Sequence, residues 1–307
     1  MPQHPRRAKE FKTRLYRQEP GGTVVRVGEL TVRNPLSRRF PTWTAELLPV
    51  TRQTNEVEIT LTKLETGLTA KETGHGPAGE GPKSFSRATF SVKENGAPTE
   101  KWSVCGISVS NAAGEVRPGG TYGSRWERGE HKVDFEGALW LEEAAWKLDV
   151  DFARTEDFPT DELWFIKGTR VPRHGDLEAM RVVTNLHFAE LEFLGVSGAK
   201  TVLPADYAAI RPHANVHLRT PHPLNGVRVA LVEVRDDQGR KLETKGSTAR
   251  ASMGGRGNTP REILHGFGVE IPEDAKTLDI TLAATRVRRV EFLARPVMFE
   301  SNSEVRK

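Results

Sequence analysis

Apolar and polar residues alternate over short runs along much of this chain. The clearest run covers residues 146–153, where the apolar positions are Trp146, Leu148, Val150 and Phe152. Charged or small residues, among them Asp149 and Asp151, occupy the positions between them. Successive side chains of a β-strand project to opposite faces, so this period of two predicts a sheet with one buried and one wet face.

A second run reproduces the first roughly 130 positions later in the chain. Residues 269–283 resemble residues 139–153 in their order of apolar and acidic positions. Each run follows a turn-rich segment typical of a hairpin, residues 107–115 in the first case and 232–240 in the second. A repeat of this length suits whole domains, because the units of solenoids and propellers are much shorter.

We therefore expect an all-β protein made of two tandem Ig-like antiparallel β-sandwich domains. The expected organisation is a basic tail at 1–22, a first sandwich at 23–172, a linker at 173–178, a second sandwich at 179–296 and a C-terminal tail at 297–307. Two glycine-rich stretches, 71–82 and 250–260, are expected to be loops. The sequence leaves open whether these loops become ordered when a partner binds.

One family resemblance supports this organisation. The run Leu139–Arg154, followed by Leu163-Trp164 and closed by Val290–Leu293 and Pro296, resembles uncharacterised bacterial proteins built of two Ig-like β-sandwiches. The resemblance covers most of residues 40–296, and its motifs are structural. It implies the tandem fold and no activity, so no catalytic residue is carried over. Such proteins often carry an N-terminal membrane anchor, and no such apolar segment is recognisable here.

Positive charge is concentrated at the N-terminus. Residues 1–20 contain six basic and two acidic side chains, which leaves 39 of each in the remainder of the chain. A neutral body argues against specific nucleic-acid binding, which needs a basic face. The basic residues of the tail are Arg6, Arg7, Lys9, Lys12, Arg14 and Arg17.

This tail has two alternative structures, a disordered segment or a short amphipathic helix with Phe11 and Leu15 on one face. In either form its charge attracts acidic surfaces through a screened interaction that reaches about 10 Å at 0.1 M salt. We predict that the tail attaches the protein to an acidic protein or to an anionic membrane surface.

Two missing sequence features bear on the cellular location of the protein. No apolar run is long enough to span a membrane, and the first twenty residues do not have the pattern of a secretory signal. The sequence leaves the location open: cytoplasmic is the default, and association with the cell envelope is the alternative. Cys105 is the single cysteine, so no internal disulfide is expected, and its strand-like context indicates a small buried residue.

The sequence contains no P-loop, no Gly-x-Ser-x-Gly, no His-Glu-x-x-His and no Cys-x-x-Cys motif. We therefore expect no enzyme and no cofactor. The weak metal candidates are His213, His217 and His222. His213 and His217 would lie about 13 Å apart on an extended strand, too far for one metal ion unless the chain bends between them. Asp149 and Asp151 are expected on a solvated sheet face, with calcium binding or glycoside hydrolysis as weaker alternatives.

One tryptophan differs from the others in its surroundings. Trp126 lies between Arg125 and Arg128 in a charged stretch that we expect to be a loop. An exposed tryptophan of this kind stacks on a sugar or anchors a partner, and the alternative is that it folds over one end of the sandwich.

The leading hypothesis is a non-enzymatic binding or assembly module. It would engage another protein, a multi-subunit assembly or a membrane-associated complex through sandwich loops or edges and through the basic tail. The alternative is a carbohydrate-binding protein that uses the loop aromatics of the first domain. An enzyme with an unrecognised site is the third hypothesis, and fold alone does not separate the three.

Overall fold

The computed structural model describes residues 8–19, 22, 24–34, 40–69, 84–117, 121–171, 177–186, 189–199, 213–221, 226–253 and 260–300. In these ranges the protein is all-β, as the alternating patterns predict, and the helical content is one 3-10 turn, η1 (Thr160–Glu162). No helix within the described part of the chain has the length and apolar character needed to cross a membrane. The glycine-rich stretch at 71–82 lies outside the described residues.

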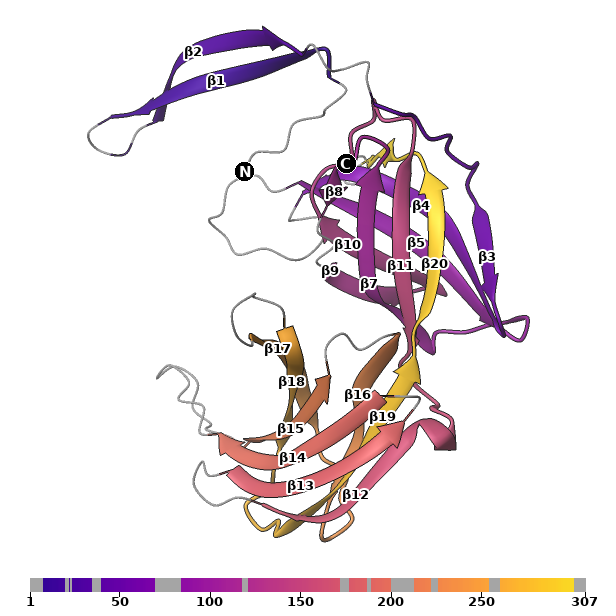
Figure 1. Ribbon diagram of the computed structural model, residues 1–307, viewed down its shortest axis with the longest axis vertical. Coiled ribbons are helices and arrows are strands. Elements are labelled where there is room, and N and C mark those ends of the chain that lie inside the picture. The colour runs from indigo at the N-terminus through magenta and orange to yellow at the C-terminus, as the bar shows by residue number, and fades with distance from the viewer. Residues whose placement is uncertain are drawn as a thin grey trace, which may run out of the picture. The chain divides into compact units, whose positions relative to one another are not determined.

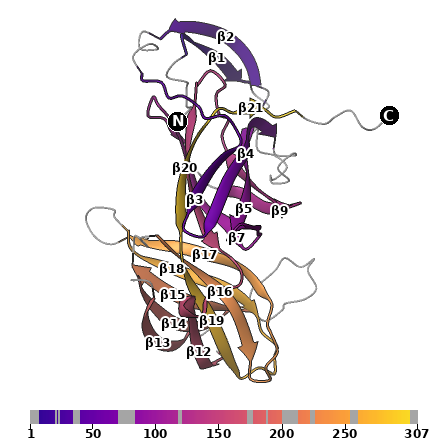
Figure 2. The same cartoon turned by 90° about the vertical axis from the view of Figure 1, so that its right-hand side faces the viewer.

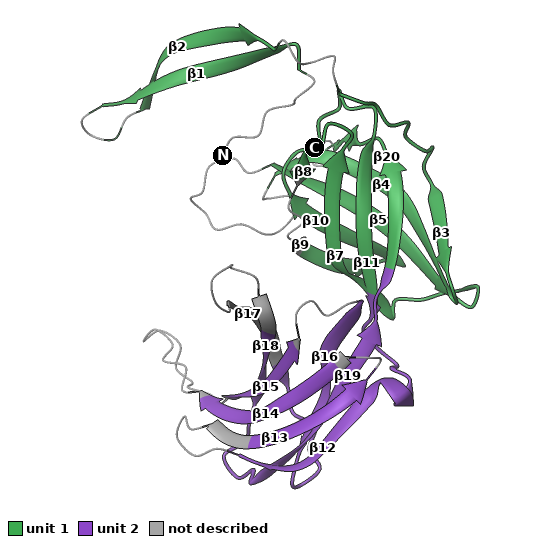
Figure 3. Ribbon diagram, in the orientation of Figure 1, with its two compact units in different colours: residues 1–152, 289–307 green, residues 153–288 purple. Residues whose placement is uncertain are grey.

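The chain forms two compact units, coloured separately in Figure 3. Unit 1 comprises residues 1–152 and 289–307, and unit 2 comprises residues 153–288. The chain thus passes between the units twice, whereas the sequence predicted a single boundary at residues 173–178. Of that predicted linker only residues 177 and 178 are described, and both belong to a strand.

Besides the two-stranded sheet near its N-terminus, unit 1 has two larger sheets that face each other across a hydrophobic core (Figure 1). The larger sheet consists of β3 (Val50–Thr54), β4 (Val57–Thr69), β5 (Ser84–Glu94), β6 (Ala97–Pro98), β9 (Thr121–Glu127), β10 (Glu130–Glu136) and β21 (Val297–Met298). The smaller sheet consists of β7 (Trp102–Asn111), β8 (Val116–Arg117), β11 (Trp146–Arg154) and β20 (Arg288–Ala294). Phe90 of the larger sheet meets Phe152 of the smaller one edge-on, with ring centroids 5.2 Å apart.

Unit 2 repeats this arrangement around its own core, as Figure 2 also shows. Its larger sheet consists of β13 (Leu177–Leu186), β14 (Ala189–Ala199), β15 (His213–Pro221), β17 (Thr244–Met253) and β18 (Pro260–Glu270). Its smaller sheet consists of β12 (Leu163–Arg170), β16 (Val227–Asp236) and β19 (Thr277–Arg286). The core draws on both sheets, for example on Phe193 and Phe267 from the larger and Leu278 and Leu282 from the smaller.

The alternating runs form the buried strands that they predicted. Large residues of β11 and β19 are fully or almost fully buried, namely Trp146, Leu148, Val150, Phe152, Leu278, Ile280 and Leu282. Asp149 lies on the wet face of β11, where its carboxylate is 3.3 Å from the Lys147 ammonium group. The exposed Asp279 accepts a hydrogen bond of 2.9 Å from the Gly168 backbone N–H. The prediction of one buried and one wet face is therefore confirmed.

The two units share one strand order. Neighbouring strands in the larger sheet of unit 1 run β4-β5-β10-β9, and those in unit 2 run β14-β15-β18-β17. In the smaller sheets, β11 lies between β7 and β20, while β19 lies between β16 and β12. The corresponding strands also follow one another in the same order along the chain, so the two similar sequence runs lead into equivalent strands, β11 and β19.

The last strand of each repeat is exchanged. β12 follows β11 in the chain but pairs with β19, and β20 follows β19 but lies beside β11. Trp164 and Ile166 of β12 enter the core of unit 2, whereas Val290 and Phe292 of β20 enter the core of unit 1. This reciprocal exchange explains why the compact units differ from the two contiguous domains that the sequence predicted.

Residues 1–22 were predicted to be a tail, and this prediction is wrong for residues 10–18. They form strand β1 (Glu10–Gln18), which pairs with β2 (Val24–Arg33) in an antiparallel hairpin (Figure 1). The four-residue spacing of Phe11 and Leu15 fits one face of a helix but fits one face of a strand equally well. The partner strand decides between the two. Gly22 has a φ of 87° in the connection between β1 and β2, a conformation that favours glycine.

Candidate interaction surface

The β1–β2 hairpin is amphipathic. Residues directly opposite each other on antiparallel strands project to the same face. One set of pairs is predominantly apolar: Phe11–Val32, Thr13–Leu30 and Leu15–Gly28. The alternate pairs carry charge: Glu10–Arg33, Lys12–Thr31 and Arg14–Glu29. The hairpin thus has the one-sided pattern of a strand pair that covers a hydrophobic core.

A bulge changes this pattern toward the turn. The register shifts between Leu15 and Tyr16, where Val27 is the additional residue of β2. Beyond the bulge Val25 lies opposite Arg17, which places both Val25 and the basic Arg17 on the same face as Leu15. We call the resulting set of side chains the apolar face; it consists of Phe11, Leu15, Val25, Leu30 and Val32.

Most of the apolar face is open to solvent. Leu15 is 46% exposed, Leu30 57% and Val32 55%. Seven of the fourteen large hydrophobic residues that are exposed in the described part of the chain belong to this hairpin, and four of the seven belong to the apolar face. Exposed apolar side chains are ordinary when scattered, but a contiguous set marks a surface that another molecule covers.

Among the described residues, no third strand supports the hairpin. β1 and β2 form a two-stranded sheet of their own, and an isolated two-stranded hairpin is marginally stable in water. Covering one half-exposed Leu or Val removes apolar area worth about 1 kcal/mol. The five residues of the apolar face together correspond to roughly 5 kcal/mol, which is large against the stability of a hairpin.

The opposite face holds an ion-pair cluster. The Arg14 Nε lies 3.1 Å from a Glu29 carboxylate oxygen, and the Arg26 Nη2 lies 2.7 Å from the same oxygen. The Arg14 hydrogen bond lowers the pKa of Glu29, so this carboxylate is ionised at neutral pH. The two strands contain five basic and two acidic residues in all. The hairpin is therefore a net cation with one apolar side.

The predicted tail residues are distributed as follows. Lys12, Arg14 and Arg17 lie in β1, Lys9 directly precedes it, and Arg6 and Arg7 lie outside the described residues. The sequence reasoning missed the residues that β2 contributes, above all Leu30 and Val32. Their signal was present, because two alternating runs that flank a Gly-Gly pair are a hairpin pattern.

Trp126 lies in strand β9, and the prediction of an exposed loop is wrong. Its indole ring stacks on the His131 ring at a centroid distance of 4.9 Å and packs against the core of unit 1. The indole N–H donates to the Ser103 hydroxyl at 3.4 Å. Trp126 therefore covers the core, which was the alternative interpretation of this residue.

The two arginines beside Trp126 have separate environments. Arg125 donates to the Asp134 carboxylate at 3.2 Å, next to a buried bidentate pair in which Arg87 contacts Asp134 at 2.6 and 3.0 Å. Arg128 lies in the turn between β9 and β10, with a φ of 55°. The three predicted binding residues do not converge on one surface feature.

The predicted metal candidates are only partly described. The His217 Nε2 lies 2.6 Å from the Ser197 hydroxyl, and burial lowers the pKa of His217. The His213 side chain and the whole of His222 lie outside the described residues. Among the residues that the structure does describe, no group of three or more His, Cys, Asp or Glu side chains is placed to hold a metal ion. Cys105 is half-buried and donates from Sγ to the Asp151 carbonyl at 3.4 Å.

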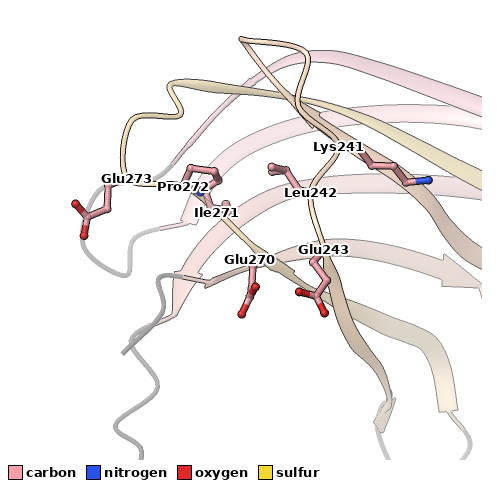
Figure 4. Close-up of a pocket in the computed structure, with 7 residues that line it drawn as sticks. All are labelled: Lys241, Leu242, Glu243, Glu270, Ile271, Pro272 and Glu273. Atoms are coloured by element: carbon pink, nitrogen blue, oxygen red, sulfur yellow. The ribbon is translucent and has the colours of Figure 1, made fainter. Parts of the chain in front are cut away.

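Unit 2 contains a pocket of about 390 Å³ (Figure 4). It is lined by Lys241, Leu242, Glu243, Glu270, Ile271, Pro272 and Glu273. The carboxylates of Glu243 and Glu270 point to the same side, whereas Glu273 points away from them (Figure 4). The charged residues of the lining are Lys241 and three glutamates, and charged residues of this kind alone do not identify a ligand.

Comparison with known proteins adds little. No protein-family model matches the chain, and no curated protein matches it. One solved structure that does match is described as the crystal structure of the conserved domain protein from Bacillus anthracis. The two chains are 10% identical in sequence, and the match covers 82% of this chain and 91% of the Bacillus anthracis chain, with a TM-score of 0.22. A score this low supports no conclusion on fold or function.

Proposed function

We propose that this protein is a non-enzymatic interaction module, in which two tandem Ig-like β-sandwiches carry an amphipathic hairpin that makes the main contact. The observation behind the proposal is the exposed apolar face of β1 and β2. Water-exposed apolar area of this kind favours association with a second surface. Two facing, mostly antiparallel sheets in each unit, with one strand order, support the Ig-like interpretation.

Trp126 favours this function over carbohydrate binding. A sugar-stacking tryptophan presents a ring face to solvent, whereas the Trp126 ring is partly buried, with one face stacked on His131 and with packing against the core. The hairpin is also a better contact element than a disordered tail, because its side chains are already ordered on two faces and lose less conformational entropy on binding.

The test measures how accessible each face of the hairpin is to a thiol reagent. Because Cys105 is the single cysteine, a Cys105→Ser background allows one new thiol to be labelled. Leu30→Cys reports on the apolar face, and the neighbouring Thr31→Cys reports on the charged face as the matched control. In purified protein both thiols should react rapidly with a membrane-permeable maleimide.

In intact cells of the source organism, the Leu30→Cys thiol should react at least about tenfold more slowly, because maleimide reacts with the thiolate and apolar surroundings disfavour the thiolate. The Thr31→Cys thiol should keep most of its reactivity. Equal reactivity of the two thiols in cells would mean that nothing covers the apolar face, and the proposed function would be wrong.

A further inference from the structure

The excess positive charge of the protein lies in the N-terminal segment that also carries the apolar face. Residues 1–34 contain eight basic and three acidic side chains, which leaves 37 basic and 38 acidic in the rest of the chain. The remainder is close to neutral, so the hairpin and the residues before it hold the whole excess. Electrostatic complementarity therefore calls for an anionic partner.

The size of the hairpin argues against a protein partner, including a second copy of this chain. A stable protein interface uses about 20–30 residues on each side. β1 has 9 residues and β2 has 10, and only five of these belong to the apolar face. A lipid surface has no such requirement, because binding there adds up from apolar burial and attraction to anionic headgroups.

The polar features of the hairpin agree with a lipid surface as its partner. Glu29 is held between Arg14 and Arg26, so its negative charge is offset within the charged face. Tyr16 is 55% exposed near the turn, and tyrosine is a residue that favours the membrane–water interface. Unpaired backbone edges exclude a two-stranded hairpin from the hydrocarbon interior but not from the hydrated headgroup layer.

We infer that the surface contacted by the hairpin is an anionic lipid bilayer. The apolar face lies among the upper acyl carbons, and basic side chains such as Lys12 and Arg33 lie beside the lipid phosphates. This inference rests on the proposed function and names the partner of the same site.

Co-sedimentation of the full chain with lipid vesicles tests it. Vesicles of phosphatidylcholine alone are compared with vesicles that contain about one third phosphatidylglycerol, at about 0.05 M and about 0.3 M salt. The protein should bind the anionic vesicles at least about tenfold more tightly than the neutral ones, and higher salt should weaken this binding severalfold. Equal partitioning to both vesicle types, or no binding to either, would overturn the inference.

Two neutral substitutions on neighbouring positions separate the faces. Leu30→Asn should weaken vesicle binding about fivefold, and Thr31→Asn should leave it unchanged, since only the first removes inserted apolar area. A polarity-sensitive dye on Leu30→Cys should shift to the blue on anionic vesicles, whereas the same dye on Thr31→Cys should not. This second measurement decides the matter even if Leu30→Asn disturbs the hairpin; absence of the shift would overturn the inference.

The outcomes for the two proposals differ. If the Leu30→Cys thiol is protected in cells but the protein does not bind anionic vesicles, the proposed interaction module is supported and its partner is a protein. If the protein sediments in solution as a dimer that Leu30→Asn dissociates, the partner is a second copy and the lipid inference is wrong. If the thiol is not protected in cells, the proposed function itself fails.

Discussion

Phe292 offers a direct test of the strand exchange. It lies in β20, beyond all the strands of unit 2, yet its side chain is fully buried in the core of unit 1. Its ring centroid is 6.0 Å from that of Phe90, and the Arg52 guanidinium lies 5.5 Å above the ring. Replacing Phe292 by Ala removes a large buried side chain and leaves a cavity, which costs about 3–5 kcal/mol.

Tryptophan fluorescence reports mainly on the unfolding of unit 1, whose core contains Phe292. Five of the six tryptophans belong to unit 1, and only Trp164 belongs to unit 2. With a denaturant dependence of about 2 kcal/mol per molar urea, Phe292→Ala should lower the midpoint of the fluorescence transition by roughly 2 M. Native-state hydrogen exchange should show the loss of protection in β7 and β11 rather than in β16 and β19.

The neighbouring residue supplies the control. Glu291 is exposed and its carboxylate lies 3.3 Å from the Lys147 ammonium group, so Glu291→Ala should cost less than about 1 kcal/mol. If Phe292→Ala leaves the fluorescence transition in place, or if protection is lost only in β16 and β19, then β20 belongs to unit 2 and the exchange described above is wrong.

Two further predictions concern buried polar groups in unit 1. Burial lowers the pKa of His131 to about 4, so between pH 7.5 and 5 the unfolded chain gains a proton there that the folded chain does not, and the unfolding free energy should fall by about 2 kcal/mol. Urea unfolding at both pH values should show a fall that is larger by about 2 kcal/mol in the wild type than in His131→Gln; the same fall in both proteins would contradict the assignment. Asp134→Ala should lower the unfolding free energy by about 3–5 kcal/mol, because it removes the carboxylate that pairs with the buried Arg87 guanidinium. The double variant Arg87→Met/Asp134→Leu should recover most of that loss in the same assay, and a loss as large as that of the single variant would refute the role of the pair.

Several features of the fold could be predicted from sequence, and the hairpin shows where such prediction stops. Alternation at Trp146–Phe152 and at Leu278–Leu282 correctly predicted which side chains are buried. The same period of two is present in β1, but its few apolar residues lie among many charges and also fit a helix. Only pairing with β2 shows that Phe11, Leu15 and Leu30 share one face.

Trp126 shows a second limit. Charged neighbours suggested an exposed loop, because arginine and glutamate are rarely buried. In the structure these neighbours alternate with the indole along β9, so that Trp126 meets His131 and the core while Arg125 meets Asp134 on the other side of the sheet. Side chains that are adjacent along a strand project to opposite faces of the sheet and therefore have different surroundings.

The sequence by itself determined that the chain is built of strands, which residues of the strands β11 and β19 are buried, and that one unit is used twice. It determined these because side-chain alternation and burial depend on the identity of each residue. Only the tertiary structure decided that β12 pairs with β19 and that β20 lies beside β11. The hydrogen bonds that join strands come from the backbone, which is nearly the same for every residue. Two equivalent strands with similar patterns therefore fit either sheet, and the packing of the whole chain selects the partner.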